Sequence, residues 1–339
     1  MPLDIIGGEY CIEANALNKD IKSSIKPQFS LGRTCLYSIL SALKSHLGGV
    51  LIPDYICYSV AEVPIRLRIP FKHYHVSYFL PNIESIKTLY LENKHKGKIA
   101  ILLVSYFGLV DLNQIIPEIR KDLSDVIIIV DDVQNYYGFA QYNDFDYCFT
   151  SYRKWFPVPD GADVLYKNNY EKLELYSRCA DYVDFKVSGA LLKNHRNYIG
   201  DSISLKLLNK GEEMMDDSYL FGCSELSQKL LNRIDFDLIA NKRRKNAEYL
   251  HNGLEKMNIH HLYNPDRVPL FIPIVIDNRD KVRSFLFSKN IFVPVHWPLK
   301  DKNTQGNNEL YSKELSLVCD QRYDEKDMEK ILRAIEYSL

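Results

Sequence analysis

A continuously apolar run that ends in acidic residues constrains this sequence more than any other feature. Residues 126–130 read Val-Ile-Ile-Ile-Val, and Asp131, Asp132, Val133 and Gln134 follow directly. Apolar β-branched residues without polar alternation are typical of a strand buried on both faces of a parallel sheet. In open α/β sheets, ligands bind outside the carboxyl ends of the strands. Because consecutive strand residues point to opposite faces, we expect one of the two acids to meet a ligand there.

A second short strand is predicted at residues 147–150, and it leads into Ser151 and Lys154. If its carboxyl end lies at the same edge of the sheet, an acid, a hydroxyl and an amine converge on one crevice. Taken singly, each has an ordinary interpretation. A lone Lys is most often solvated, and paired Asp residues after a strand most often bond nearby turn or cap amides.

A helix is predicted to start at Gly32, Arg33 and Thr34, because apolar residues then recur at helical spacing. Gly48 and Gly49 are expected to end it. The amino end of a helix offers unpaired N–H donors, and a Gly lets an anion approach the backbone closely, so this segment is a candidate phosphate site. The alternative is that Thr34 merely caps a core helix.

Strand and helix patterns alternate between residues 50 and 132, which predicts right-handed βαβ units. The fold class is therefore α/β, with a mostly parallel central sheet flanked by helices. A long helical region begins after Ser224, and short strands and helices follow from Pro269. We expect a large domain with an amino-terminal arm at residues 1–245 and a small α+β domain at residues 246–339.

The order of these motifs resembles one group of enzymes. A buried strand, D-x-x-Q from Asp131 to Gln134, S-x-x-K from Ser151 to Lys154 and a turn of small residues at 160–162 are similar to fold-type I enzymes that use pyridoxal 5'-phosphate (PLP). Within that fold, the chain looks most like the DegT/DnrJ/EryC1/StrS family of sugar aminotransferases. The resemblance covers nearly the whole chain.

This resemblance implies PLP as the cofactor and a role for each motif residue. Lys154 would form the Schiff base and shuttle a proton, and Asp131 would face the pyridine nitrogen. Gln134 would lie near the ring hydroxyl or the ring face. The groups that would hold the phosphate belong to Gly32, Arg33, Thr34 and Ser151.

The chain departs from the family pattern in three places, all of which concern cofactor contacts. The aromatic residue that often stacks on the cofactor aligns with Cys57, so Tyr58 beside it is the candidate. Phe149 stands where the family usually has a Ser. The turn at residues 160–162 reads Asp-Gly-Ala where two glycines are usual. None of these departures removes the reactive amine.

The resemblance also implies substrates and a partner. An amino group would pass from glutamate to a nucleotide-linked keto-deoxysugar, for polysaccharide or natural-product biosynthesis. The enzyme would be a homodimer with shared active sites, so His195, Arg196 and Asn197 are candidates for substrate or phosphate contacts, with a solvated loop as the alternative. His296 is a candidate for the substrate side, with a packed or surface His as the alternative.

Composition and missing motifs argue against several other classes of protein. The 339 residues carry a net charge of −1, so no nucleic-acid partner is expected. The seven scattered cysteines never form C-x-x-C, which argues against a disulfide framework and against a metal site. We expect a cytoplasmic protein, because neither a signal sequence nor a membrane-spanning run is recognisable. Dinucleotide, P-loop, zincin and hydrolase motifs are absent as well.

Three alternatives stay open at this point. One is another PLP reaction, such as sugar dehydration, although related dehydratases replace the Lys with His. A second is transamination of an amino acid, which would need an Arg clamp for a second carboxylate. The third is a non-enzymatic binding protein that keeps the fold.

Overall fold

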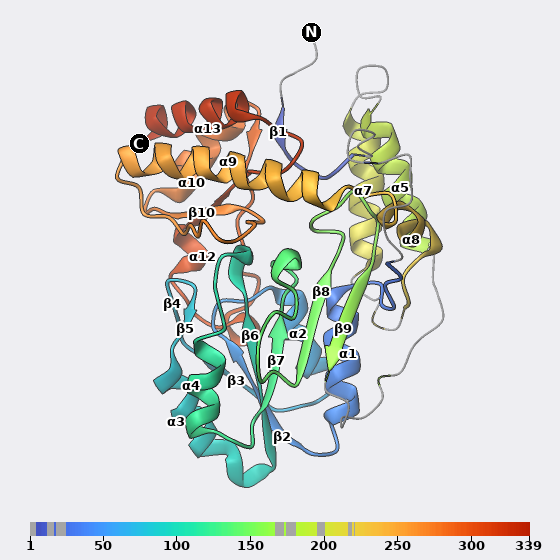
Figure 1. The fold of residues 1–339 in the computed structure, drawn as a ribbon, viewed down its shortest axis with the longest axis vertical. Coiled ribbons are helices and arrows are strands. Elements are labelled where there is room, and N and C mark those ends of the chain that lie inside the picture. The colour runs from blue at the N-terminus through green and yellow to red at the C-terminus, as the bar shows by residue number, and fades with distance from the viewer. Residues whose placement is uncertain are drawn as a thin grey trace.

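The centre of the structure is a six-stranded sheet (Figure 1). The computed structural model describes residues 5–11, 17, 25–166, 173, 181–194, 201–215, 219 and 221–339. The strands run in the spatial order β3 (Phe71–Tyr74), β2 (Leu47–Pro53), β6 (Lys98–Val104), β7 (Ile127–Asp131), β8 (Tyr147–Ser151) and β9 (Ala162–Tyr166). All neighbouring pairs are parallel except β8 and β9, which are antiparallel. The predicted mostly parallel α/β sheet is confirmed.

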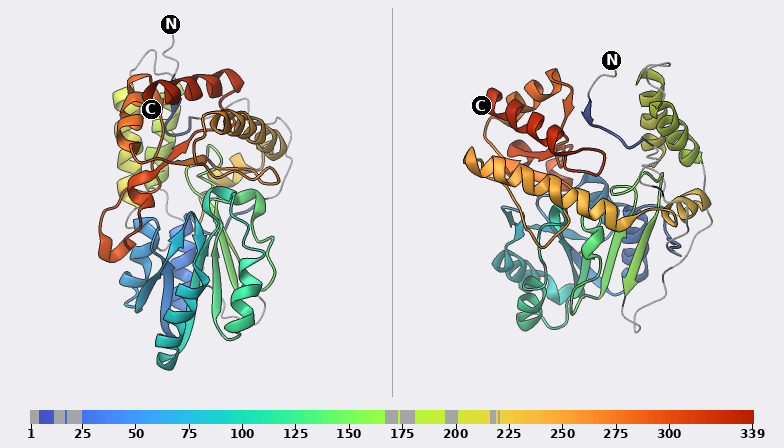
Figure 2. Two further views of the ribbon diagram at one scale, coloured as in Figure 1. Left: turned by 90° about the vertical axis from the view of Figure 1, so that its left-hand side faces the viewer. Right: turned by 45° about the horizontal axis from the view of Figure 1, so that its top comes forward.

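Helices cover both faces of this sheet (Figures 1 and 2). The helices α1 (Gly32–Leu43) and α2 (Tyr58–Arg66) pack together on one face, and α3 (Ile83–Asn93) and α4 (Ile115–Asp122) on the other. The central strands are therefore covered on both sides, and every residue of β7 is buried. This burial explains the unbroken apolar run that precedes Asp131.

Gly48 and Gly49 were expected to end the first helix, and that prediction is wrong. The helix ends at Leu43, and Gly48 and Gly49 lie inside β2. A Cβ atom on Gly48 would come within 2.7 Å of the Gly97 backbone nitrogen. The glycines therefore serve the close approach of two backbone segments, where the pairing of β2 with β6 is irregular.

Two helices extend from the sheet domain beside its last strand. They are α5 (Asp181–Asn194) and α7 (Asp201–Met215), and they pack against each other. Residues 191–202, a polar stretch whose sequence follows no clear helix or strand period, include the end of α5 and the start of α7. His195, Arg196 and Asn197, the candidates between these helices, lie outside the described residues.

The long helical region after Ser224 consists of two helices. Ser224 caps α8 (Glu225–Leu231) by accepting a hydrogen bond from the Ser227 amide, and Asp235 caps α9 (Phe236–Lys256). The expected domain boundary at residues 245 and 246 falls inside α9, which is one continuous helix of 21 residues. Figure 1 shows this helix lying across the top of the sheet domain.

The C-terminal segment forms a small α+β unit above the sheet (Figure 1). Its strands β10 (Ile272–Val275) and β12 (Glu314–Leu317) are antiparallel, and β11 (Ile291–Phe292) pairs with β1 (Ile6–Gly7) of the amino-terminal arm. Its helices are α10 (Arg279–Ser288), α11 (Lys302–Gln305), α12 (Leu310–Lys313) and α13 (Glu325–Ser338). The arm thus reaches the C-terminal unit.

Short elements complete the fold. The strands β4 (Val76–Ser77) and β5 (Leu80–Pro81) form a hairpin, and the 3₁₀ turns are η2 (Lys94–Lys96), η3 (Tyr106–Gly108) and η4 (Tyr136–Gly138). Among the helices that the structure describes, none has the length and apolar character that crossing a bilayer would require.

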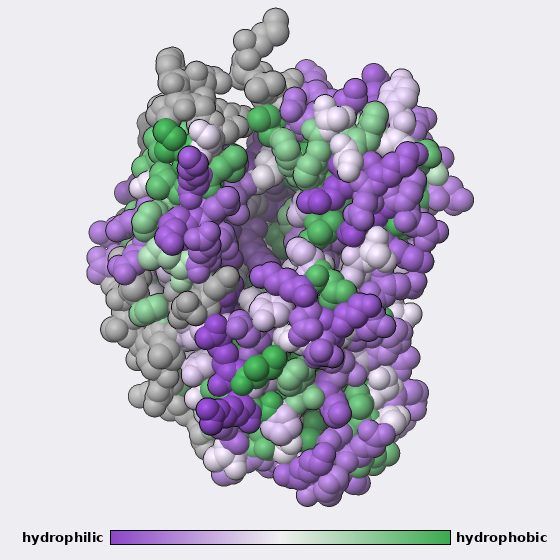
Figure 3. Space-filling view, turned by 180° about the vertical axis from the view of Figure 1, so that it is seen from behind, coloured by the Kyte–Doolittle hydropathy of each residue, from purple (hydrophilic) through white to green (hydrophobic). Residues whose placement is uncertain are grey.

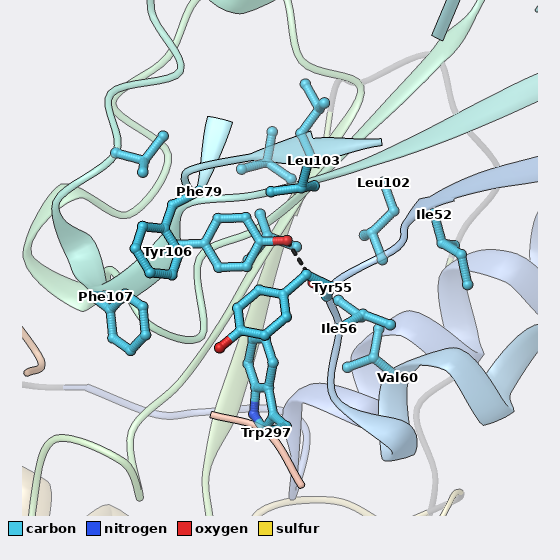
Figure 4. Close-up of a cluster of buried hydrophobic side chains, with 14 of the residues drawn as sticks. Ile52, Tyr55, Ile56, Val60, Phe79, Leu102, Leu103, Tyr106, Phe107 and Trp297 are labelled. Atoms are coloured by element: carbon cyan, nitrogen blue, oxygen red, sulfur yellow. Dashed lines mark hydrogen bonds between the residues drawn. The ribbon is translucent and has the colours of Figure 1, made fainter. Parts of the chain in front are cut away.

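A cluster of aromatic side chains joins the C-terminal unit to the sheet domain (Figure 4). The ring centroid of Trp297 lies 5.4 Å from that of Tyr55 and 6.2 Å from that of Tyr106. The Tyr106 hydroxyl donates a hydrogen bond of 2.6 Å to the Tyr55 carbonyl. Because all three side chains are at least nine-tenths buried, this contact belongs to the main hydrophobic core.

Candidate active site

A cavity of about 330 Å³ lies at the carboxyl ends of β6, β7 and β8 and the amino ends of α1 and α2. From behind, the space-filling view shows the surface hollowed where the upper elements meet the sheet domain (Figure 3). The walls include seven of the residues proposed from sequence, namely Gly32, Arg33, Tyr58, Asp131, Gln134, Ser151 and Lys154. Residues that lie more than a hundred positions apart therefore meet at the predicted edge of the sheet.

Asp131 is the last residue of β7 and is 5% exposed. Its Oδ1 accepts a hydrogen bond of 2.9 Å from the Val133 amide, whereas Oδ2 accepts none from the residues described. Burial raises the pKa of Asp131 to about 6, against the effects of the Val133 amide and the Lys154 charge. A cationic partner inside the cavity would therefore stabilise this carboxylate.

Asp132 has a different environment and is fully buried. Burial raises its pKa to about 7 although several donors oppose that shift. Its carboxylate accepts hydrogen bonds of 2.8 to 3.3 Å from the Asn135 amide, the Ala140 N–H, the Tyr142 hydroxyl and the Cys148 thiol. All four donors belong to the protein, so Asp132 stabilises the fold and Asp131 is the acid that faces the cavity.

Lys154 lies three residues after β8 and is partly buried. Its ammonium group forms no hydrogen bond or ion pair with any residue in the described ranges. Burial lowers the pKa of Lys154, and the neighbouring Arg153 charge adds to that effect. An amine that is neutral part of the time can act both as a nucleophile and as a base.

Gln134 presents an unused donor near the cavity. Its Oε1 accepts a hydrogen bond of 2.9 Å from the Phe107 amide, but its buried Nε2 has no partner in the described chain. Within the described residues, the Ser151 hydroxyl makes one long hydrogen bond, of 3.4 Å, to the Gly161 carbonyl. Because unpaired buried polar groups are costly, Gln134 Nε2 is well placed to donate to a ligand.

The amino end of α1 is open towards the cavity. The residue before the helix, Leu31, provides no side-chain cap. A Cβ atom on Gly32 would lie 2.6 Å from Val133 Cγ2, so only Gly lets the helix end approach the loop after β7. Thr34 does not cap the helix, which begins at Gly32, and it is not among the residues that line the cavity. Its buried hydroxyl lies 3.2 Å from the Ser30 hydroxyl.

The aromatic candidate Tyr58 is the first residue of α2. The Lys300 ammonium lies 5.0 Å from the centre of its ring, a cation–π contact between the sheet domain and the C-terminal unit. Cys57 precedes the helix, and its sulfur lies 3.2 Å from the Ser59 hydroxyl oxygen. Tyr58, Cys57 and Lys300 all line the cavity.

His296 belongs to a hydrogen-bonded network with Ser316 and Glu314. Of these three residues, only His296 was a candidate from the sequence. Its Nδ1 lies 2.7 Å from the Ser316 hydroxyl oxygen, and that hydroxyl donates to Glu314 Oε1. Glu314 Oε2 accepts the His296 amide at 2.6 Å. Burial, followed by the Lys154 charge, lowers the pKa of His296 to about 3, and burial raises that of Glu314 to about 8. The imidazole is therefore neutral at physiological pH.

The polar side chains of β12 were overlooked, although their spacing held a signal. Glu314 and Ser316 alternate with Leu315 and Leu317 in a strand that is buried throughout. Two polar residues on one face of a buried strand must find partners within the protein. This spacing predicts a buried polar cluster around Glu314 and Ser316. It does not reveal that His296 is the third member of that cluster.

A charged group on the helix pair was also missed. The Arg153 guanidinium lies 3.0 Å from Glu212 Oε1 on α7, and the Lys186 ammonium of α5 lies 2.7 Å from the same oxygen. Although burial opposes the shift, Arg153 and Lys186 lower the pKa of Glu212 to about 2. Glu212 is therefore an anion in the cavity wall, and it ties the helix pair to the segment that carries Lys154.

Comparison with known proteins shows the fold. No family model matches the sequence, and no curated protein does either. A DegT DnrJ EryC1 StrS aminotransferase from Brucella abortus matches the structure with a TM-score of 0.59 at 17% identity, over 91% of this chain and 84% of its own. S. venezuelae DesV, in complex with a ketimine intermediate, matches with a TM-score of 0.64 at 15% identity, over 91% and 83% of the two chains.

A third match spans nearly the full length of both proteins. The Streptococcus pneumoniae protein Spr1654, assigned as a sugar aminotransferase and solved in its PMP form, matches with a TM-score of 0.65 at 12% identity, over 98% of this chain and 97% of its own. The chain therefore has the fold of these aminotransferases. The fold that the sequence motifs predicted is confirmed.

Proposed function

We propose that this chain is a PLP-dependent sugar aminotransferase that moves an amino group from glutamate to a nucleotide-linked keto-deoxysugar. One observation carries the proposal above all others. In one cavity, the unpaired amine of Lys154 is combined with the buried carboxylate of Asp131, and each influences the ionisation of the other. The similar folds named above add to it, because the Brucella abortus protein is an aminotransferase by name and Spr1654 is assigned as a sugar aminotransferase.

The residues present fit PLP. Three polar groups lack a protein partner within the described chain: the Lys154 amine, Asp131 Oδ2 and Gln134 Nε2. PLP offers an aldehyde, a basic ring nitrogen and a ring hydroxyl, which suit these groups in turn. The uncapped amino end of α1, with Gly32 at its first position, suits the phosphate. A cavity of about 330 Å³ is within the usual range for a cofactor of this size.

Bound PLP would supply an electrophilic carbonyl carbon and a conjugated ring that delocalises the electrons of a broken C–H bond. Lys154 Nζ, kept partly neutral by burial, would take the proton from the donor carbon and return it to the product side. Asp131 would hold a proton on the ring nitrogen, since a buried carboxylate favours a cation beside it. His296 does not line this cavity but a neighbouring one that Lys154 also lines, and burial keeps its imidazole neutral.

The rim of the cavity favours a phosphorylated substrate. Arg33, Arg66 and Lys300 all line it. The Arg66 guanidinium lies 3.0 Å from Glu62 Oε1 and 4.5 Å from the centre of the Tyr219 ring, and these contacts hold it in the cavity wall. Cationic side chains together with the rings of Tyr58 and Trp297 in the same wall suit a nucleoside diphosphate, and the sugar would then extend towards Lys154.

A second copy of the chain would complete the enzyme. Three large apolar side chains on the helix pair, Leu191, Ile203 and Leu205, are each 46 to 47% exposed. Exposed apolar residues on adjacent helices are typical of a symmetric protein interface. We propose that α5 and α7 contribute to a homodimer whose two active sites lie near the interface.

The decisive experiment locates the reactive amine. The full-length protein is mixed with PLP, its visible absorbance is recorded, and the adduct is reduced with borohydride and mapped by peptide mass spectrometry. We expect the adduct on Lys154 and none on Lys300, the other lysine in the same cavity. The Lys154→Ala variant should fold, lose the adduct and lose transamination by at least about a thousandfold.

Control and substrate tests follow from the same preparation. Lys300→Ala should keep the adduct and lose affinity for the nucleotide sugar. Wild-type protein with glutamate and a panel of nucleotide-linked keto-sugars should give a mass consistent with replacement of a carbonyl oxygen by an amine. An adduct on another lysine, or near-normal turnover by Lys154→Ala, would contradict the proposal.

A further inference from the structure

The carboxyl end of α9 carries a cluster of metal-ligating side chains that the proposed reaction does not use. His251 and Glu255 are four residues apart, on consecutive turns of this helix, and therefore lie on one face. The chain then turns back, and His261 forms an antiparallel bridge with Ile274 of β10. One ligand atom from each of His251, Glu255 and His261 lies within 4.8 Å of the others.

We propose that His251, Glu255 and His261 form a zinc site on the C-terminal unit. His251 Nδ1 lies 2.8 Å from His261 Nε2, and His261 Nε2 lies 3.7 Å from Glu255 Oε1. Two imidazoles and one carboxylate are a ligand set that Zn²⁺ takes, with water in the fourth position. Mg²⁺ and Ca²⁺ prefer oxygen ligands and would be poorly served.

The tautomer of His261 prepares it for a metal. Its Nδ1 lies 2.7 Å from the Ile259 carbonyl oxygen, and a carbonyl can only accept, so Nδ1 carries the proton. The lone pair of the neutral ring is therefore on Nε2, which faces the other two side chains. A hydrogen bond from the distal ring nitrogen to a backbone carbonyl is the usual support of a zinc-bound His. The His261 side chain is 3% exposed, so its position is well defined.

His251 and Glu255 can adjust to complete the site. The His251 ring stacks on Tyr263, with centroids 4.1 Å apart. Without metal, its Nδ1 donates to His261 Nε2; on binding, that proton moves to the His251 Nε2 and Nδ1 becomes a ligand. The Glu255 side chain is 65% exposed, so an ion can enter from solvent.

The required movement is small. Two nitrogens that bind Zn²⁺ tetrahedrally at about 2.05 Å stand roughly 3.3 Å apart. The observed 2.8 Å therefore needs to open by about half an ångström, and the partly exposed His251 can supply that by a rotation on the helix surface. The backbone on the other side is fixed, because Leu262 donates to the Pro273 carbonyl at 3.1 Å and Val275 to the His260 carbonyl at 2.9 Å.

Zinc at this position would stabilise the contact between the two parts of the fold. His260, next to His261, stacks on Tyr78 of the sheet domain, with centroids 4.0 Å apart. An ion that joins the end of α9 to this segment would hold the stacked pair in place. The site is separate from Lys154, so the effect on transamination would be indirect.

The test is a zinc titration of the full-length protein after dialysis against a chelator and then against chelator-free buffer. Calorimetry should show one Zn²⁺ bound per chain, and the unfolding temperature should rise in the presence of Zn²⁺. Mg²⁺ at the same concentration should do neither. His251→Ala, a change on a partly exposed helix face, should lower the zinc affinity at least about tenfold and remove the thermal shift.

A matched control separates this site from surface binding. His95 is an exposed His in the sheet domain, and His95→Ala should leave both readouts unchanged. His261→Gln should behave as His251→Ala does. If the wild type shows no saturable zinc binding, or if His251→Ala binds zinc as the wild type does, the proposal is wrong and the two imidazoles serve only as a hydrogen-bonded pair.

Discussion

Glu314 is a buried carboxylate whose ionisation the fold opposes, and Glu314→Gln tests that directly. The side chain is fully buried in β12 and accepts hydrogen bonds from the Ser316 hydroxyl and the His296 amide. Burial raises its pKa from 4.5 to about 8. A Gln keeps the shape, can accept from the His296 amide and can donate to Ser316, so it mimics the protonated acid.

The sign and size of the effect follow from this pKa. Since the folded pKa of Glu314 is raised, its protonated form contributes stability that is complete below about pH 4.5 and is lost as the pH rises through 8. Between pH 6 and pH 9 the wild type should lose about 3 kcal/mol of unfolding free energy through this group alone, at about 1.4 kcal/mol per pH unit while the folded acid stays protonated. Glu314→Gln removes that loss.

The assay is urea unfolding of the wild type and Glu314→Gln at pH 6, 7.5 and 9, followed by tyrosine and tryptophan fluorescence. The variant should gain stability relative to the wild type as the pH rises. Glu309→Gln is the control, because Glu309 is exposed on the preceding turn and pairs only with Lys313 among the described residues. Stability curves that run parallel in the wild type and Glu314→Gln would refute the reasoning.

Two further predictions concern function and assembly. Asp131→Asn should retain PLP poorly, measured by absorbance after gel filtration, but should unfold near the wild-type urea concentration, since Asn keeps the acceptor for the Val133 amide. Asp132→Asn should retain PLP but lose about 1–3 kcal/mol of unfolding free energy, because its NH₂ group would face donors such as the Ala140 amide. Leu205→Glu should convert the proposed dimer into monomers, as measured by sedimentation. A wild-type monomer that transaminates would disprove the proposed assembly.

The sheet was predictable because its signal is local. An unbroken apolar run such as residues 127–130 has few other solutions, and helix and strand patterns alternate regularly before it. Asp131 and Gln134 follow one predicted strand, and Ser151 and Lys154 follow the next. Their convergence on one crevice was expected if both strands end at the same edge of the sheet, and the resemblance to PLP enzymes supported it. These residues do line one cavity.

The errors arose where a residue serves a contact that sequence does not display. Gly48 was expected to end a helix because Gly often does so, but its close neighbour is Gly97, which lies in another segment. Thr34 stays a candidate for the phosphate, and its hydroxyl lies 3.2 Å from that of Ser30. For Gly48 the local rule was sound, and a tertiary contact decided the outcome.

The C-terminal unit forms one wall of the cavity through Trp297, Pro298 and Lys300. Its packing against the sheet domain could not have been predicted from the periodicity of the sequence. Gln305 donates to the Ile56 carbonyl at 3.0 Å, and Asn308 donates to Asp54 at 2.7 Å. A Cβ atom on Gly306, whose φ is +92°, would lie 2.6 Å from the Asp54 Cα, so this loop sits directly on the segment after β2.

These bonds imply that the wall is fixed before any ligand arrives. The segment that contains Gln305, at the end of α11, and Asn308 follows Trp297 and Lys300, which line the cavity. It leads through α12 into β12, which carries Glu314. Because α9 is continuous across the expected boundary, it restrains the same unit from the other side. If the chain acts as proposed, its substrate would meet a wall that these hydrogen bonds already hold, so less binding energy would be needed to bring the two parts of the fold together.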